Sequence, residues 1–154
     1  MLAKASGCKE APAVPRLRLA IAAMLALALQ SAPVAATAPD SHDVALSIAN
    51  DGHEPIRCLI LFAHFVVTEA GTIPPGGDLA IAMSRQDSDG ALWIARADGR
   101  RMMIETVECG AASRWAETRG QIPLLPARAG RAVGYRSTCR LNRTVLCDDP
   151  APLP

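Results

Sequence analysis

The chain has 154 residues, a formal net charge of +1 at pH 7 and an aromatic content of only 3%. A near-neutral chain with so few aromatic residues lacks the basic, base-stacking surface of nucleic-acid-binding proteins, so we expect no nucleic-acid partner. Half of the residues are hydrophobic. Much of that share comes from one N-terminal segment, which has to be set apart before the fold is considered.

Residues 1–36 have the layout of an export signal. An uninterrupted apolar run, 19–29, is preceded by four basic residues and followed by small ones. We therefore expect a helical secretory signal peptide, cleaved after Ala36 or as late as Ala38, and a periplasmic or secreted product of bacterial export. The alternative is an uncleaved anchor, which would be the only contact with a membrane, but the run is shorter than the roughly 20 residues of a membrane span.

The predicted mature chain is unevenly charged. It would carry 12 Arg, no Lys and 14 acidic residues, for a net charge of −2. Residues 37–109 hold 5 Arg and 11 acids, a charge of −6, whereas residues 114–143 hold 7 Arg and 1 acid, a charge of +6. Such asymmetry can form a binding face for an acidic partner. Because the arginines are spread along the sequence, we expect instead that the two halves pair with each other.

Short apolar runs separated by Gly, Pro and Asp turns indicate a series of strands. The expected strands are 43–50, 55–67, 79–83, 92–95, 102–109, 132–139 and 144–147. The longest, 55–67, is apolar at both parities, which predicts a strand in the middle of a sheet or sandwich. Residues 111–119 predict one helical turn or a loop, and residues 149–154 predict a disordered Pro-rich tail.

The predicted mature chain contains four cysteines: Cys58, Cys109, Cys139 and Cys147. An even number in an exported chain, without a CxxC pair, favours disulfides over a metal or redox site. Three pairings are possible. We expect Cys139–Cys147, because the segment between them folds naturally into a hairpin, and hence Cys58–Cys109.

These features predict one all-β domain over residues 37–148. Strands at this spacing, with Gly and Pro turns, are typical of a small antiparallel sandwich or, alternatively, a small β-barrel. A cystine that links the central strand to a later strand suits an immunoglobulin-like sandwich, in which Trp93 or Trp115 would lie beside it. Fold alone does not imply function.

His64 and Glu105 form a candidate polar pair. His64 shares a parity with Cys58 on its predicted strand, and Glu105 shares a parity with Cys109 on another. If the two cysteines are bonded in antiparallel strands, both side chains point inward at the same end of the domain. A buried histidine needs a partner, so we expect a hydrogen-bonded structural pair, with a functional site as the alternative.

Residues 110–119 contain a second candidate group: Arg114, Trp115 and Arg119. Trp and Arg together recur in interface hot spots, so these residues are a candidate interface. The alternative is that Trp115 caps the core while the Arg stems pack over it.

Signals for metal binding and catalysis are weak. His42, His53 and His64, with Met83, Met102 and Met103, could supply copper ligands in an oxidising compartment, but their spacing matches no metal-binding pattern. We therefore expect no bound metal and no cofactor. There is no nucleophile motif and no distinguished pair of carboxylates, so we expect no enzyme activity.

The sequence thus predicts an exported, non-catalytic binding or accessory domain, stabilised by two disulfides, that recognises a periplasmic protein partner through its surface. Two alternatives are a periplasmic copper carrier that uses His64 and methionines, and a hydrolase whose site the sequence does not reveal. An exposed patch around Trp115 would favour the binding domain. Converging His and Met side chains would favour the carrier, and a cleft with His64 and Glu105 would favour the enzyme.

Overall fold

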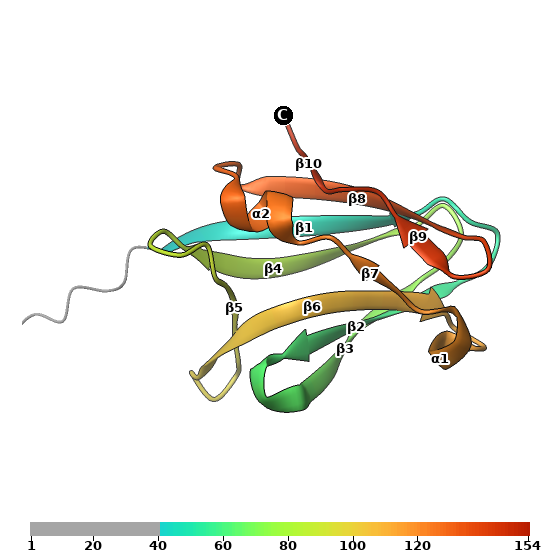
Figure 1. The fold of residues 1–154 in the computed structure, drawn as a ribbon, viewed down its shortest axis with the longest axis horizontal. Helices are drawn as coiled ribbons and strands as arrows, with labels where there is room; N and C mark the ends of the chain where they lie inside the picture. Colours follow the sequence, from blue (N-terminus) through green and yellow to red (C-terminus); the bar gives the residue numbers. More distant parts are fainter. Residues whose placement is uncertain (1–40) are drawn as a thin grey trace, which may run out of the picture. The chain divides into compact units, whose positions relative to one another are not determined.

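Ten strands make up one mixed sheet in the computed structural model, which describes residues 41–154 (Figure 1). The all-β prediction is therefore confirmed. The elements are β1 (Ser41–Asn50), β2 (Ile56–Phe62), η1 (Ala63–Phe65), β3 (Val66–Ile73), β4 (Asp78–Gln86), β5 (Leu92–Ala95), β6 (Arg101–Ala111), α1 (Trp115–Thr118), β7 (Gly120–Ile122), α2 (Leu125–Ala129), β8 (Gly134–Leu141), β9 (Val145–Cys147) and β10 (Ala151–Pro152). The predicted signal peptide, residues 1–36, lies outside the described residues, as do positions 37–40 of the predicted domain. Within residues 41–154, no helix has both the length and the apolar character that crossing a membrane requires.

The strands follow the order β10-β8-β1-β4-β5-β6-β2-β3, with β7 paired to β6 and β9 paired to β8. β1 and β8 run parallel, in contrast to antiparallel pairs such as β1–β4 and β2–β6. The short strand β5 connects two halves of the sheet, which face each other in Figure 1: β8, β1 and β4 in one half, and β6, β2 and β3 in the other. The immunoglobulin-like sandwich is not confirmed, because the strands belong to one continuous mixed sheet and Cys58–Cys109 joins neighbouring strands of it.

The core lies between these two halves. β1 buries Val44, Leu46 and Ile48 and exposes Asp43 and Ala45, the period-two pattern of a strand with one face in the core. Large buried side chains from both halves join in one cluster, including Leu46, Ile48, Ile56, Ile60, Phe62, Ile104, Val107 and Tyr135. Burial of apolar surface is the main favourable term in folding, so this alternation explains why these segments become strands.

Residues 55–67 do not form the single strand that their composition predicts. β2 ends at Phe62, the chain turns through Ala63–Phe65, and β3 returns antiparallel along β2. The single-strand prediction is wrong because the turn contains no Gly, Asn or Pro, the residues by which a turn is normally recognised in a sequence. His64 and Phe65 instead adopt left-handed backbone conformations, with φ of 65° and 61°, in a region that glycine normally occupies. β2 itself is an interior strand, as expected, flanked by β6 and β3.

The C-terminal tail also differs from the prediction. The tail is not disordered, because β10 pairs antiparallel with β8 and the Leu153 N–H donates to the Gly134 carbonyl oxygen at 2.9 Å. The outer edge of β8 needs hydrogen-bond partners, and the tail supplies them.

The helix α2 contains Pro126 in its first turn, where the missing N–H removes no helical hydrogen bond.

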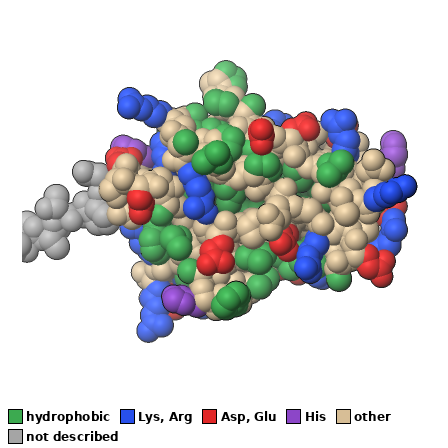
Figure 2. All heavy atoms as spheres, viewed as in Figure 1, with side chains coloured by type: hydrophobic (Ala, Val, Ile, Leu, Met, Phe, Trp, Pro, Cys, Tyr) green, Lys and Arg blue, Asp and Glu red, His purple; other side chains and the backbone are tan. Residues whose placement is uncertain are grey.

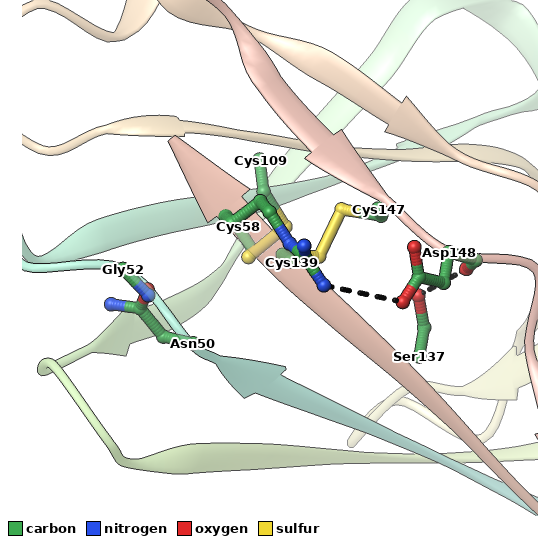
Figure 3. The surroundings of a disulfide bond; sticks show 9 residues. Asn50, Gly52, Cys58, Cys109, Ser137, Cys139, Cys147 and Asp148 are labelled. Carbon is green, nitrogen blue, oxygen red and sulfur yellow. Dashed lines mark hydrogen bonds and ion pairs between the residues drawn. A yellow bond between two sulfur atoms is a disulfide. The ribbon is translucent and has the colours of Figure 1, made fainter. Parts of the chain in front are cut away.

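Both predicted disulfides are present (Figure 3). Cys58 and Cys109 lie opposite each other on β2 and β6, with their Cα atoms 4.1 Å apart. Cys139 and Cys147 lie opposite each other on β8 and β9, with their Cα atoms 4.0 Å apart. Each bond therefore ties two neighbouring strands together, one bond in each half of the sheet.

Asn50, the last residue of β1, has a buried polar side chain with 1% of its surface exposed. Its Nδ2 donates to the carbonyl oxygens of Glu54, at 2.9 Å, and Ile73, at 3.0 Å. Its Oδ1 accepts from the Gly52 N–H at 2.9 Å. The amide thus links the turn after β1 to the end of β3, and its buried polar atoms all have partners.

Candidate functional site

The tip of the β2–β3 hairpin exposes three consecutive large apolar side chains. Phe65 is 95% exposed, Val66 39% and Val67 50%. Within residues 41–154, the other exposed large hydrophobics, Leu125, Val133, Leu146 and Leu153, are separate from one another in the sequence. Grouped exposed apolar residues often indicate an interaction site, whereas single ones are ordinary.

β3 is the last strand in the sheet order. One edge of β3 therefore pairs with β2, and its other edge pairs with no described strand. Its first four residues, Val66 to Glu69, are exposed. Val66 and Thr68 lie opposite Phe62 and Ile60 in register, on the side that β2 buries. Because Val66 and Thr68 are nevertheless exposed, the other half of the sheet does not cover this part of β3.

Edge strands are normally protected from pairing with other chains by charges, prolines or bulges. The described part of β3 has one charged residue, Glu69, and a register shift opposite Cys58 and Leu59, and it contains no proline. Val66, Val67 and Thr68 come before both the charge and the register shift, and no described strand pairs with the outer edge of β3. We call residues 64–69, which join the hairpin tip to this edge, the edge site.

The turn that carries the edge site is conformationally strained. Left-handed conformations at residues other than glycine cost about 1 kcal/mol or more each, and here His64 and Phe65 adopt them in succession. Burial does not compensate for this at Phe65, because its side chain is almost fully exposed. Strain of this kind is concentrated at binding sites and switch regions, which supports a functional role for the tip.

The inward-facing pair of His64 and Glu105 does not form. Both residues are exposed, and no hydrogen bond or ion pair between their side chains is found in the described part of the chain. The alternation of side chains along the strands gives the wrong orientation for both residues. His64 lies beyond the end of β2. Glu105 sits in a bulge, because Leu61 pairs with Thr106 but Phe62 pairs with Ile104. His64 instead becomes part of the edge site, and Glu105 stays exposed on β6.

Trp115, at the start of α1, is half-buried and packs against the fold, whereas the interface hypothesis expects an exposed ring. A Cβ at Gly110 would overlap the Trp115 ring and backbone, so the absence of a side chain there makes room for the tryptophan. The guanidinium carbons of Arg57 and Arg119 lie 5.9 Å and 5.5 Å from the ring centroid, within the range of cation–π contacts. This is the arrangement of a core cap with arginines packed over it, and a partner at Arg114, Trp115 and Arg119 stays a prediction.

We expect Trp115→Ala to lower the free energy of unfolding by about 2 kcal/mol, because it removes a half-buried ring and two cation–π contacts. Urea denaturation followed by circular dichroism measures this change. Arg114→Ala is the matched control, because its ion pair with Glu54 is exposed and exposed pairs contribute little. An unchanged urea midpoint for Trp115→Ala would show that the ring does not stabilise the core.

The residues of the copper alternative do not converge. His42 contacts Asp87, its Nε2 lying 2.9 Å from the carboxylate oxygen. Met83 is buried in the core, whereas His64 is exposed at the hairpin tip. Residues 41–154 contain no group of three or more His, Cys, Asp or Glu side chains that could hold a metal ion.

The uneven charges of the two sequence halves pair with each other, as the sequence predicts. In the described part of the chain, Arg–carboxylate pairs join the acidic half to the basic half: Glu54–Arg114 at 3.5 Å, Glu108–Arg119 at 3.8 Å and Asp78–Arg136 at 3.8 Å. Acidic and basic side chains are correspondingly interspersed over the face in Figure 2.

No family model, curated protein or solved structure matches the chain.

Proposed function

We propose that this protein is an exported, non-catalytic binding domain that captures an extended segment of another protein by strand addition at the edge site. The observation that carries the proposal is the free edge of β3, which continues directly from the exposed tip Phe65 to Val67. In strand addition, main-chain hydrogen bonds supply affinity and alternate side chains supply specificity.

The geometry favours an extended partner over a helix or a broad surface. Successive side chains of a strand point to opposite faces, so Val66 and Thr68 lie on one face and Val67 and Glu69 on the other. An added strand would lie beside β3 in the plane of the sheet and would place its own alternate side chains next to those of β3 on both faces.

The partner strand can be described by its chemistry. Apolar side chains would pack beside Val66 and Val67, and a basic residue would pair favourably with Glu69, because opposite charges on adjacent strands stabilise each other. The two disulfides indicate an oxidising compartment outside the cytoplasm for the domain. The N-terminal signal pattern supports the periplasm as that compartment.

Phe65→Gly is expected to weaken capture of the partner without lowering the melting temperature. Glycine adopts a φ of 61° without strain, and a side chain that is 95% exposed contributes little burial. The measurement combines affinity capture from a periplasmic extract with thermal unfolding of the purified variant. Leu125→Ala is the control, because Leu125 is exposed and apolar but lies on α2, outside the edge site.

Capture alone does not establish strand addition, so the bound state is also examined by amide hydrogen exchange. We expect the amides of residues 66–69 to become protected in the complex, and Val67→Lys to weaken it. Protection confined to another element, or equal capture by Phe65→Gly and the native protein, contradicts the proposal. Self-association through β3, or binding of Phe65 to phospholipid vesicles in place of a protein, also contradicts it.

A further inference from the structure

A polar cavity of about 520 Å³ lies among the first strand, the end of β4 and the end of α2. It is lined by His42, Arg85, Gln86, Asp87, Gly90 and the segment 128–131. Its volume is within the range of small-molecule sites. The cavity shares no lining residue with the edge site.

Arg85 is the buried charge of this cavity. Only 6% of its surface is exposed. Its Nη1 donates to the carbonyl oxygens of Ala127, at 3.2 Å, and Ala132, at 3.4 Å. Among residues 41–154, no carboxylate forms an ion pair with it, and its Nε and Nη2 donate no hydrogen bond.

A buried arginine without an acidic partner is unusual, because buried charges in proteins are normally paired. Asp87, the carboxylate in the cavity lining, already binds His42. Arg85 therefore keeps donors for a negatively charged group that the described part of the chain does not supply.

Two further arginines, Arg128 and Arg131, are among the residues that line the cavity. Arg128 uses Nη2 to donate to the carbonyl oxygens of Ile104, at 2.8 Å, and Glu105, at 3.1 Å. Its charge meets no carboxylate in the described chain, and neither does that of Arg131, which is exposed. Other arginines of the basic half, such as Arg114 and Arg119, do have acidic partners. Of the arginines of the basic half that pair with no carboxylate in the described chain, Arg128 and Arg131 line this cavity and Arg143 does not.

We propose that this cavity binds a small molecule through a phosphate or carboxylate group, with Arg85 as its principal ligand and Arg131 at its entrance. The planar guanidinium fork matches both kinds of oxyanion and can bind either with two parallel hydrogen bonds. Asp87, whose carboxylate oxygen lies 2.9 Å from His42 Nε2, opposes the anion.

Isothermal titration of the oxidised protein with pyrophosphate and with citrate, in a chloride buffer of constant ionic strength, tests the proposal. We expect saturable binding of at least one of the two probes at one site per chain. Arg131→Gln should weaken it about tenfold, as loss of a charged hydrogen bond does. Arg143→Gln is the matched control, because Arg143 is exposed and does not line the cavity, and its affinity should stay within about twofold.

Tighter binding of pyrophosphate assigns the natural ligand to phosphate compounds, and tighter binding of citrate assigns it to carboxylates. Arg85→Lys should weaken either probe more than Arg131→Gln does, because an ammonium group cannot reproduce the fork. If Arg85→Lys does not fold, Asp87→Asn replaces it, and removal of the opposing charge should strengthen binding. Absence of saturable binding, or equal weakening by Arg131→Gln and Arg143→Gln, overturns the proposal.

Discussion

Asn50→Asp is expected to lower the free energy of unfolding by about 4 kcal/mol. The Asn50 Nδ2 donates to two backbone carbonyl oxygens in a site that is almost completely buried. A carboxylate would direct a negative oxygen at both carbonyls, leave them without a donor and bury an unpaired charge. Each unsatisfied buried group costs about 1–3 kcal/mol, and a buried charge costs more.

The measurement is equilibrium urea unfolding at neutral pH, where the introduced carboxyl group is ionised in the unfolded chain. Asp51→Asn is the matched control: it changes the charge by one unit at the next position, where the side chain is exposed. Its effect should be within about 0.5 kcal/mol. An Asn50→Asp midpoint close to that of the native protein would show that the Asn50 amide does not link the turn to β3.

The second large effect is expected from the disulfide between β2 and β6. Replacing both Cys58 and Cys109 by alanine should lower the stability by about 4 kcal/mol, whereas the same change at Cys139 and Cys147 should lower it by about 2.5 kcal/mol. The difference follows from the sequence separations of 51 and 8 residues, because a longer closed loop removes more entropy from the unfolded chain.

The two double variants serve as controls for each other, since each removes one cross-strand cystine from an antiparallel pair. Guanidinium unfolding of both, with fluorescence and circular dichroism as probes, gives the two free energies. A larger loss for the Cys139–Cys147 variant would mean that local packing, and not loop closure, dominates the contribution of these bonds.

Periodicity and cysteine spacing predicted much of the fold. β1 follows from its alternation, β5 was placed at residues 92–95, and the hairpin that holds Cys139 and Cys147 was expected from the short segment between them. These features depend on local pattern, which a single sequence contains. The pairing of β1 with both β4 and β8 depends on distant segments, and no pattern within β1 indicates it.

The hairpin tip and the cavity were not predicted, for different reasons. Turn residues normally reveal a reversal, but the chain turns at His64 and Phe65 without Gly, Asn or Pro. The cavity did have a signal in the sequence. In β4, Arg85 continues the core-facing parity of Ile81 and Met83, and all three are buried. A charged residue at a core-facing position of a strand is therefore the feature of the sequence that indicates this site.

The position of β1 between β4 and β8 also governs the order in which the fold can be completed. A chain synthesised from its N-terminus produces β1 and β4 long before β8, so one side of β1 has no neighbour until residues 134–141 appear. Contacts between such distant segments slow folding, and an unpaired strand edge favours aggregation meanwhile. The nascent domain therefore has a prolonged period in which a chaperone that shields β1 would improve the yield of native protein.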